Sequence, residues 1–515
     1  MSGSRLRLGA LAFAAVLSAA GCSSGPDFKK PDKPTVAGYT PETLEPQTAS
    51  ANVHAGDAQS FLSGADIPGQ WWELYRSAEL NGLIEQALKA NPDLDAAQAT
   101  LRQANELLYA QQGALFPTIS GNGSATQQKI NGAQQGGSQS LQVVYGLTSA
   151  SLNISYSPDI WGGTRRAVES QQAQAEYQRF QLEATYLTLT SNVVVAAINL
   201  ASLRGQIAAT EAIIKLEGDA LRVVQSQFDL GGASRADVLQ QQAQLTATQA
   251  QLPPLQKQLA QQRNQLMTLL GKTPTEDAGQ TLQLQALQLP GDLPLSLPSQ
   301  LVEQRPDVRS AEATLHSASA EIGVATAAQL PQFSITGLWG VASGGFGSLF
   351  AAGSGVWSIG ASVAQTLFDG GQLEHKKLAA VAAYDAAAAR YRSTVLLAFQ
   401  DVANALRALQ ADADLLKAAA AAESTAQQSL NLTQQQFQLG AVNYIALLNA
   451  QQTYQNALLN RVKAQAARYS DTAALFQALG GGWWNRTDVA PQSNGKPGVF
   501  NLPPFDQVSL PRAGK

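Results

Sequence analysis

The chain has very few of the residues on which disulfides, metal sites and most active sites depend. Its 515 residues include one cysteine and three histidines. A single cysteine excludes a disulfide within one chain and a cysteine-based metal cluster. His54, His316 and His375 are far apart in the sequence, and other catalytic residue types are equally scattered. We therefore predict no metal site, no cofactor and no enzymatic activity.

Charge is also scarce. Charged residues make up 14% of the chain, against roughly 25% in a typical soluble domain. The formal net charge is −4, so a nucleic-acid partner is not expected. The chain has no GxxxxGK[ST] phosphate-binding loop, which indicates that it does not draw energy from a nucleotide.

The N-terminus has the pattern of an export signal. Arg5 and Arg7 precede an apolar run from Leu8 to Ala20, which is too short to span a bilayer. We predict a cleaved signal peptide over residues 1–21. Cys22 follows directly, in a context that resembles a bacterial lipobox, whose cysteine thiol receives a diacylglycerol. A chance cysteine within a discarded signal is the alternative. The absence of an aspartate after Cys22 is typical of similar lipoproteins delivered to the outer membrane.

The chain is a tandem duplication. Residues 91–117 and 305–331 match at an offset of 214, and residues 227–239 and 436–448 match at an offset of 209. Shared positions include the pairs Pro92 and Pro306, Pro117 and Pro331, Phe228 and Phe437, and Gly231 and Gly440. Repetition at this scale indicates two copies of one structural unit. The predicted segments are 22–78 (N-terminal), 79–298 (first repeat), 299–485 (second repeat) and 486–515 (a flexible tail).

Each repeat contains a very long helix. Apolar residues recur every seven positions from Tyr186 to Phe228, and again from Val395 to Phe437, as in a coiled-coil seam. Glu423 interrupts the second series for no reason that is visible in the sequence. A run of this length is about 100 Å long at ~1.5 Å per residue. Helices at about 79–115 and 299–330 precede the long runs, and returning helices at about 234–270 and 443–480 complete two hairpins.

Alternating segments lie between the helices. In residues 151–157, 332–339 and 356–367, apolar residues alternate with small polar ones, which predicts strands. Two strands in each repeat give four in the chain. The pattern fits a membrane β-barrel and an ordinary half-buried antiparallel sheet equally well. Four strands are too few to close a barrel, so a barrel in lipid would require several chains.

The order of these elements resembles the TolC-like outer-membrane factors. The lipobox, Trp71–Tyr75, the stretch 304–307 and the two hairpin turns are similar to the lipoprotein branch that serves efflux pumps. The resemblance covers residues 22–485. It implies a mainly α-helical protein with a membrane β-barrel, in which three chains share twelve strands and the barrel continues into a long periplasmic coiled-coil tunnel.

The resemblance also implies a function. It predicts an outer-membrane channel, lipid-anchored through Cys22, that passively conducts small molecules delivered by a periplasmic adaptor and an inner-membrane pump of the RND type. A channel for type I protein secretion and a coiled-coil scaffold without a pore are alternatives. The implied periplasmic gate comprises Arg235, Asp237, Gln240, Ile445 and Asn449, which could instead be solvated helix ends. Gly231, Gly232 and Gly440 are implied to contact the adaptor, or serve only as turns.

Overall fold

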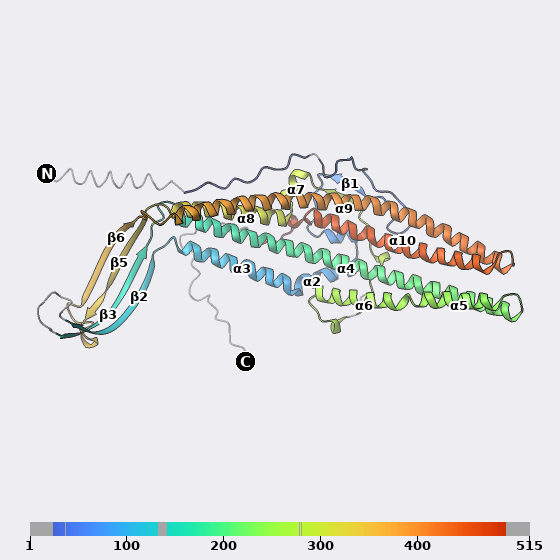
Figure 1. Ribbon diagram of the computed structural model, residues 1–515, viewed down its shortest axis with the longest axis horizontal. Helices are drawn as coiled ribbons and strands as arrows, with labels where there is room; N and C mark the ends of the chain where they lie inside the picture. Colours follow the sequence, from blue (N-terminus) through green and yellow to red (C-terminus); the bar gives the residue numbers. More distant parts are fainter. Residues whose placement is uncertain (1–23, 37, 132–141, 278, 280, 491–515) are drawn as a thin grey trace.

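The computed structural model describes residues 24–36, 38–131, 142–277, 279 and 281–490 (Figure 1). The molecule is elongated, with a β-sheet at one end, two helical hairpin tips at the other and a thicker waist between them. The predicted signal peptide and Cys22 lie outside the described residues, as does most of the predicted tail.

The segments before the strands are each two helices instead of one. In the first repeat these are α2 (Ala78–Ala90) and α3 (Pro92–Gly113), and in the second α7 (Pro298–Gln304) and α8 (Pro306–Ala327). Each break precedes a proline, which disfavours helical geometry at the residue before it. Asn91 caps α3, because its side chain accepts hydrogen bonds from the backbone N–H groups of Asp93 (2.9 Å) and Leu94 (3.3 Å).

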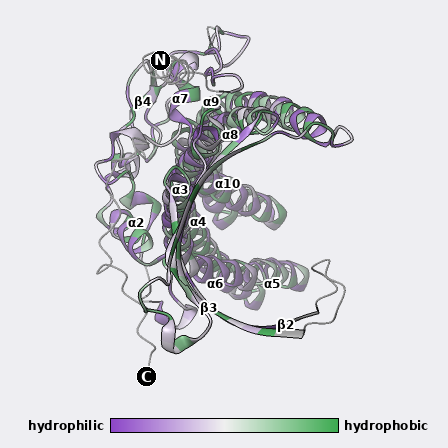
Figure 2. Ribbon diagram, turned by 90° about the vertical axis from the view of Figure 1, so that its left-hand side faces the viewer, coloured by the Kyte–Doolittle hydropathy of each residue, from purple (hydrophilic) through white to green (hydrophobic). Residues whose placement is uncertain are grey.

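The four predicted strands form one antiparallel sheet. They are β2 (Thr118–Asn131), β3 (Gln142–Tyr156), β5 (Gln332–Ser343) and β6 (Gly355–Ala364), in the order β2-β3-β5-β6. The two repeats meet where β3 pairs with β5. Viewed along the molecule, the sheet is curved and open (Figure 2). The four-stranded prediction is confirmed.

The two long helices are α4 (Gly163–Asp229) and α9 (Gln372–Gln438), each of 67 residues. The predicted seam is buried where it crosses the waist, since Val193, Val402 and Leu409 have no exposed surface. The structure also explains Glu423, which forms an ion pair with Arg461 of α10. One stretch of α4 is apolar and long enough to cross a membrane, but 67% of it is buried in the protein, as expected of a core helix.

The returning helices differ between the repeats. α10 (Tyr444–Ala478) is continuous, whereas the first repeat has α5 (Arg235–Gln249) followed by α6 (Leu252–Leu269). The prediction of one helix over 234–270 is therefore wrong at this point. Pro253 and Pro254 lie in the first turn of α6, where their missing N–H groups interrupt the hydrogen-bond series without breaking the path of the chain.

The waist holds the main hydrophobic core. A short 3₁₀ helix, Trp71–Tyr75, buries its aromatic side chains against α10, and Trp71 stacks on Phe476 with ring centroids 5.3 Å apart. Beside it, β1 (Ser60–Ser63) pairs in parallel with β4 (Asp292–Leu295). This small sheet was not predicted, because its two strands have only four residues each and lie more than 200 positions apart.

Residues 486–490, which follow the last segment of the waist core in the sequence, also pack on α4. Arg486 donates to the buried carboxylate of Glu183 (2.9 Å) and lies over the ring of Tyr186. Arg179 donates to the backbone oxygen of Ala490 (2.6 Å). The packed part of the chain therefore extends at least to Ala490, and the predicted boundary at 485 is too early.

Candidate channel site

The two faces of the four-stranded sheet differ in polarity. On one face the register places large apolar side chains beside one another: Trp339 lies opposite Trp357, and Ile119 opposite Ile154. These side chains are exposed, with 75% of Trp357 and 77% of Ile359 accessible. The other face carries serine, threonine and asparagine, and hydroxyl pairs such as Ser334 and Ser362 (2.7 Å) bridge its strands. An exposed apolar face of this size requires a non-aqueous neighbour.

Both edges of this sheet are unpaired in the described structure. β2 pairs only with β3, and β6 only with β5. The sheet therefore presents two rows of free backbone N–H and C=O groups, one on each edge. Such edges invite pairing with another strand.

The hairpin tips form the opposite end of the molecule. Gly231 and Gly440 have φ of 79° and 71°, a left-handed geometry that favours glycine and that ends α4 and α9. Beside them, Leu230 is 88% exposed and Leu439 84% exposed. The sequence analysis missed these two leucines, although the repeat at offset 209 aligns them. Each tip therefore carries the same pair, an exposed leucine followed by a glycine in left-handed geometry.

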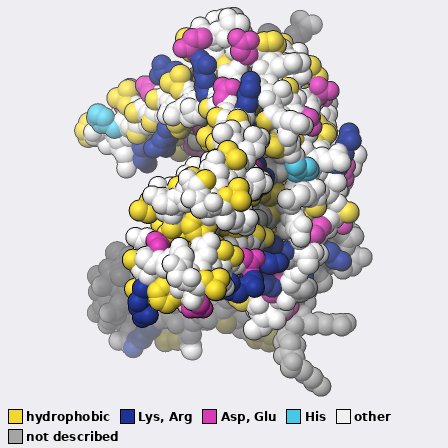
Figure 3. Space-filling view, turned by 90° about the vertical axis from the view of Figure 1, so that its right-hand side faces the viewer, with side chains coloured by type: hydrophobic (Ala, Val, Ile, Leu, Met, Phe, Trp, Pro, Cys, Tyr) yellow, Lys and Arg dark blue, Asp and Glu magenta, His cyan; other side chains and the backbone are white. Residues whose placement is uncertain are grey.

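The predicted gate residues lie just behind these tips, at the starts of α5 and α10. Arg235, Gln240, Ile445 and Asn449 are exposed on the first turns of α5 and α10. Asp237 has a structural role, because its carboxylate accepts from the backbone N–H (2.8 Å) and hydroxyl (2.7 Å) of Ser234 in a capping box. In Figure 3, which views this end, acidic, basic and apolar side chains are interspersed.

The neighbours of the gate candidates connect the two hairpins. The hydroxyl of Tyr444 on α10 donates to Gln241 on α5, and Gln244 donates to both Glu217 and Gln452 (3.0 Å each). Burial raises the pKa of Glu217 above its usual range, and hydrogen bonds from side chains on α5 act in the opposite direction. This contact is polar and buried. Sequence reasoning missed it because no heptad pattern marks glutamines that meet across two hairpins.

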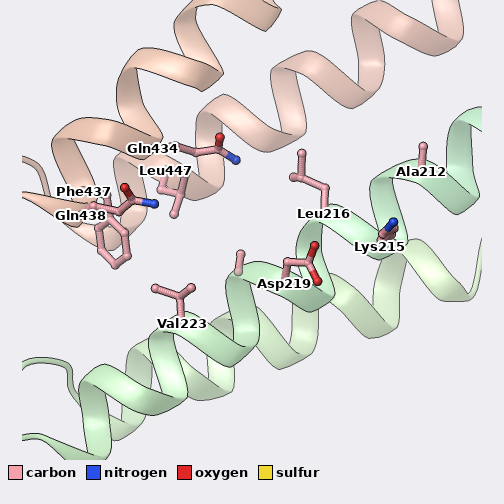
Figure 4. A pocket seen from close by; sticks show the side chains of 10 residues that line it. Ala212, Lys215, Leu216, Asp219, Val223, Gln434, Phe437, Gln438 and Leu447 are labelled. Carbon is pink, nitrogen blue, oxygen red and sulfur yellow. The ribbon is translucent and has the colours of Figure 1, made fainter.

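A groove of about 340 Å³ separates the hairpins near the tips. Figure 4 shows side chains of α4, including Leu216, Asp219 and Val223, facing Phe437 of α9 and Leu447 of α10. The groove is lined by apolar and amide side chains with one lysine and one aspartate, and it is open to solvent.

The beginning of the described chain is attached where the sheet meets the long helices. The backbone N–H of Ser24 donates to the oxygen of Trp161 (3.0 Å), and Arg166 donates to the oxygen of Ser24 (3.1 Å). Gly25 packs so closely on α8 that a Cβ atom would lie 2.5 Å from the Cα of Gly323. Ser24 and Gly25 are thus held at the base of the sheet.

Among the described residues, no group of three metal-binding side chains converges. The structure instead combines an open sheet with one apolar face, helices far longer than a compact domain needs, and exposed hairpin tips. They define the subunit of a membrane channel. The chain matches the family described as outer membrane efflux protein over residues 83–272 and 297–481, and it belongs to that family.

Curated relatives agree with this assignment. The toluene efflux pump outer membrane protein TtgC of Pseudomonas putida is 28% identical over 482 residues, covering 92% of this chain and 95% of the relative. The pyoverdine export outer membrane protein OpmQ of Pseudomonas aeruginosa is 29% identical over 457 residues, covering 87% and 94%. The chain is therefore an outer-membrane efflux protein by sequence, over nearly its whole length.

Solved structures share the fold. The outer-membrane channel OprN superposes with a TM-score of 0.81 at 27% identity, covering 90% of this chain and all of that one. The open state of the MtrE outer membrane channel of Neisseria gonorrhoeae gives a TM-score of 0.77 at 26% identity, with 90% and 100% covered. The predicted TolC-like family and channel architecture are confirmed.

Proposed function

We propose that three copies of this chain form one outer-membrane channel, which passively conducts small molecules from a periplasmic adaptor and an RND-type inner-membrane pump to the outside. The observation that carries this proposal is the open sheet, which has an exposed apolar face and two unpaired edges. The names of the relatives, which concern toluene, solvents and pyoverdine, support small-molecule efflux over protein secretion.

The unpaired edges require partner chains. Unpaired backbone groups cost several kcal/mol each in hydrocarbon, so open sheet edges do not occur there. Pairing β6 of one copy with β2 of the next removes both edges at once. Four strands cannot enclose a lumen, whereas three copies supply twelve, enough for a wide pore. The apolar face then meets lipid and the hydroxyl-rich face lines the pore.

The position of the N-terminal segment supports lipid anchoring through Cys22. Ser24 is bonded at the junction of sheet and helix, the level at which a barrel would leave the membrane. A lipid on a cysteine two residues earlier can therefore reach the inner surface of the outer membrane. Replacing Cys22 with serine should abolish metabolic labelling by a radioactive fatty acid. Undiminished labelling of the variant would refute the anchor.

The tips are the proposed meeting point with the adaptor. Gly231, Gly232 and Gly440, with Leu230 and Leu439 beside them, lie farthest from the sheet. Arg235, Gln240, Ile445 and Asn449 remain the proposed gate, because their side chains are free to meet those of neighbouring copies. Asp237 also belongs to this proposed gate region, although its carboxylate is engaged within its own helix.

The deciding experiment combines mass and conductance. Purified full-length protein in detergent should have the mass of three chains by light scattering after correction for detergent, and should produce discrete conductance steps in a planar lipid bilayer. A monodisperse monomer that gives no current at any voltage would overturn the proposal and would favour a scaffold without a pore.

A further inference from the structure

The contact between α4 and α8 joins the two repeats inside one chain, and the duplication provides a second copy of each of its sides. α4 and α9 each have 67 residues and begin after a glycine of positive φ, Gly162 and Gly371, at an offset of 209. α3 and α8 each have 22 residues, at an offset of 214. α9 and α3 are therefore the repeat equivalents of α4 and α8. They lie on opposite sides of the molecule, with α4 and α8 between them (Figure 1).

The equivalent faces are buried in the first case and exposed in the second. The α4–α8 contact includes a hydrogen bond between the hydroxyls of Ser170 and Ser317 (2.9 Å), and both residues are buried. The equivalent positions are Ala379 on α9 and Gln103 on α3, and both of these are exposed. The chain thus fills this contact once and leaves its repeat equivalent open on two edges.

The open helix faces are continuous with the unpaired edges of the sheet. α3 leads into β2, and β6 leads into α9. When β6 of one copy pairs with β2 of the next, as β3 pairs with β5 inside the chain, α9 of the first copy comes to lie beside α3 of the second. The α4–α8 contact then gives the register of these helices: Ala379 opposes Gln103, and one turn nearer the sheet Lys376 opposes Glu106.

The charges that face one another in this register are of opposite sign. α3 carries three acidic residues and one arginine. Over residues 372–392, α9 carries four basic residues and two acidic ones. Asp95 and Glu106 on α3 are exposed, and so are Lys376 and Arg390 on α9. The two edges are therefore complementary in charge.

A second contact inside the chain gives the level of Asp95. The guanidinium of Arg309 on α8 lies 5.0 Å from the ring centre of Phe180 on α4. The repeat equivalents of these two residues are Asp95 and Ala389, and Arg390 follows Ala389 directly. An acidic residue of α3 thus meets a basic residue of α9 near each end of α3.

We propose that α3 of one copy and α9 of the next form the helical contact between subunits, held in register by the ion pairs Glu106–Lys376 and Asp95–Arg390. The partner that this surface recognises is a second copy of the same chain. Its equivalent inside the chain is closed by buried hydroxyl and aromatic groups, whereas this contact is closed by exposed charges beside small side chains. It is therefore the salt-sensitive contact of the assembly. The inference rests on the proposed function, since the pairing of β6 with β2 brings the two helices together.

Disulfide cross-linking tests the register. A disulfide requires Cα atoms about 4.4–6.8 Å apart, so Gln103→Cys combined with Ala379→Cys should link subunits covalently when membranes that contain the full-length protein are oxidised. Each single variant controls for links to Cys22, the only native cysteine. Gln103→Cys combined with Ala389→Cys is the register control, because ten helical residues displace the thiol by about 15 Å. Only the first pair should give covalent dimers and trimers on a non-reducing gel.

Charge reversal in the cross-linking variant tests the ion pairs. Glu106→Lys puts like charges opposite one another at every such contact. It should slow disulfide formation about tenfold at low ionic strength, and by less than about threefold in about 1 M salt. Adding Lys376→Glu restores opposite charges and should recover the original rate. Glu211→Lys makes the same change of charge at an exposed position of α4, outside the proposed contact, and should leave the rate unchanged.

The outcomes separate this inference from the function beneath it. A trimeric, conducting protein in which the first cysteine pair links no faster than the register control overturns the helical contact and leaves the channel intact. Linking at the expected pair, at a rate that neither charge reversal nor salt changes, overturns the ion pairs. A parent protein that is monomeric and gives no current overturns the proposed function, and this contact with it. Selective linking that is slowed by Glu106→Lys and recovered by the added Lys376→Glu supports both the contact and its ion pairs.

Discussion

The ion pair between Glu423 and Arg461 lies where the coiled-coil seam should be apolar, and its removal gives a sharp test of the packing. Glu423 occupies a seam position of α9 and Arg461 faces it from α10, and the two side chains are about one-fifth exposed. Arg461 also donates to Gln465 (3.1 Å). The charges are therefore partly dehydrated and each depends on the other.

The free energy lost when this ion pair is broken follows from the partial burial of its two side chains. Two opposite charges about 4 Å apart attract by about 4 kcal/mol at an effective dielectric constant near 20, and dehydration offsets most of that gain. Exposed pairs contribute about 0–1 kcal/mol, and breaking fully buried pairs costs about 3–5 kcal/mol. We therefore expect Glu423→Leu to cost about 1–2 kcal/mol by leaving Arg461 unpaired, between these limits.

The double variant reverses the loss. With Glu423→Leu and Arg461→Leu together, no charge is unpaired and the apolar seam is continuous, so stability should match or exceed that of the parent. Hydrogen–deuterium exchange of the peptides spanning 415–430 and 455–470 measures local opening. The single variant should raise exchange about tenfold, since ~1.4 kcal/mol corresponds to that factor, and the double variant should restore it.

A control and a refuting result complete the test. Arg407 on the same helix pairs with Glu42 in solvent, with 47% and 67% of the side chains exposed, so Arg407→Leu should change exchange by less than about threefold. If Glu423→Leu alone slowed exchange as much as the double variant does, the ion pair would contribute nothing and the reasoning would fail.

Three further predictions follow from other sites. Burial, and then the neighbouring Asp471, raise the pKa of Asp412 to about 7. Because this folded-state pKa lies above the ordinary value of 3.8 for an aspartate, the stabilising contribution of protonated Asp412 is complete below about pH 3.8 and is lost as the pH rises through 7. The melting temperature should fall between about pH 4 and 7, and it should fall less in Asp412→Asn. An equal slope in both proteins would contradict the assignment. Gly271→Ala should destabilise the waist, since a Cβ there would lie 2.0 Å from the oxygen of Ala90. Gly218→Ala, inside α4 toward its tip, should raise or preserve the melting temperature, because a Cβ there would meet no atom within 4 Å. Asp237→Ala should destabilise α5 by about 0.3–1.5 kcal/mol through loss of the capping box with Ser234, seen as faster amide exchange over 235–245. Arg235→Ala should leave that exchange unchanged, and equal exchange in the two variants would show that the capping box is dispensable.

Local chemistry made much of this protein predictable. The duplication, the strands and the long helices all follow from patterns within a few residues: period two for strands, period seven for seams, and proline or glycine at their ends. The glycines at the two tips were recognisable because a left-handed turn restricts which residue can occupy it. The resemblance to a known family supplied the trimer and the gate, which the patterns alone left open.

Contacts between distant segments were not predictable in this way. The pairing of β1 with β4 joins residues that share no local pattern. The same holds for the ion pairs of Glu423 with Arg461 and of Glu183 with Arg486. The polar link through Gln241 and Tyr444 belongs to the same group. In these cases the partner of a side chain is decided by how whole helices lie against one another.

The amino-acid sequence by itself determined the repeat and the order of the elements. It also separated the strand segments 151–157, 332–339 and 356–367 into an apolar and a small polar side, because side-chain alternation is a local property of an extended chain. Only the tertiary structure decided which strands are neighbours, which edges stay unpaired and what the buried charges contact. These depend on packing between segments hundreds of residues apart, where many arrangements satisfy the same local pattern and the shared core at the waist selects one.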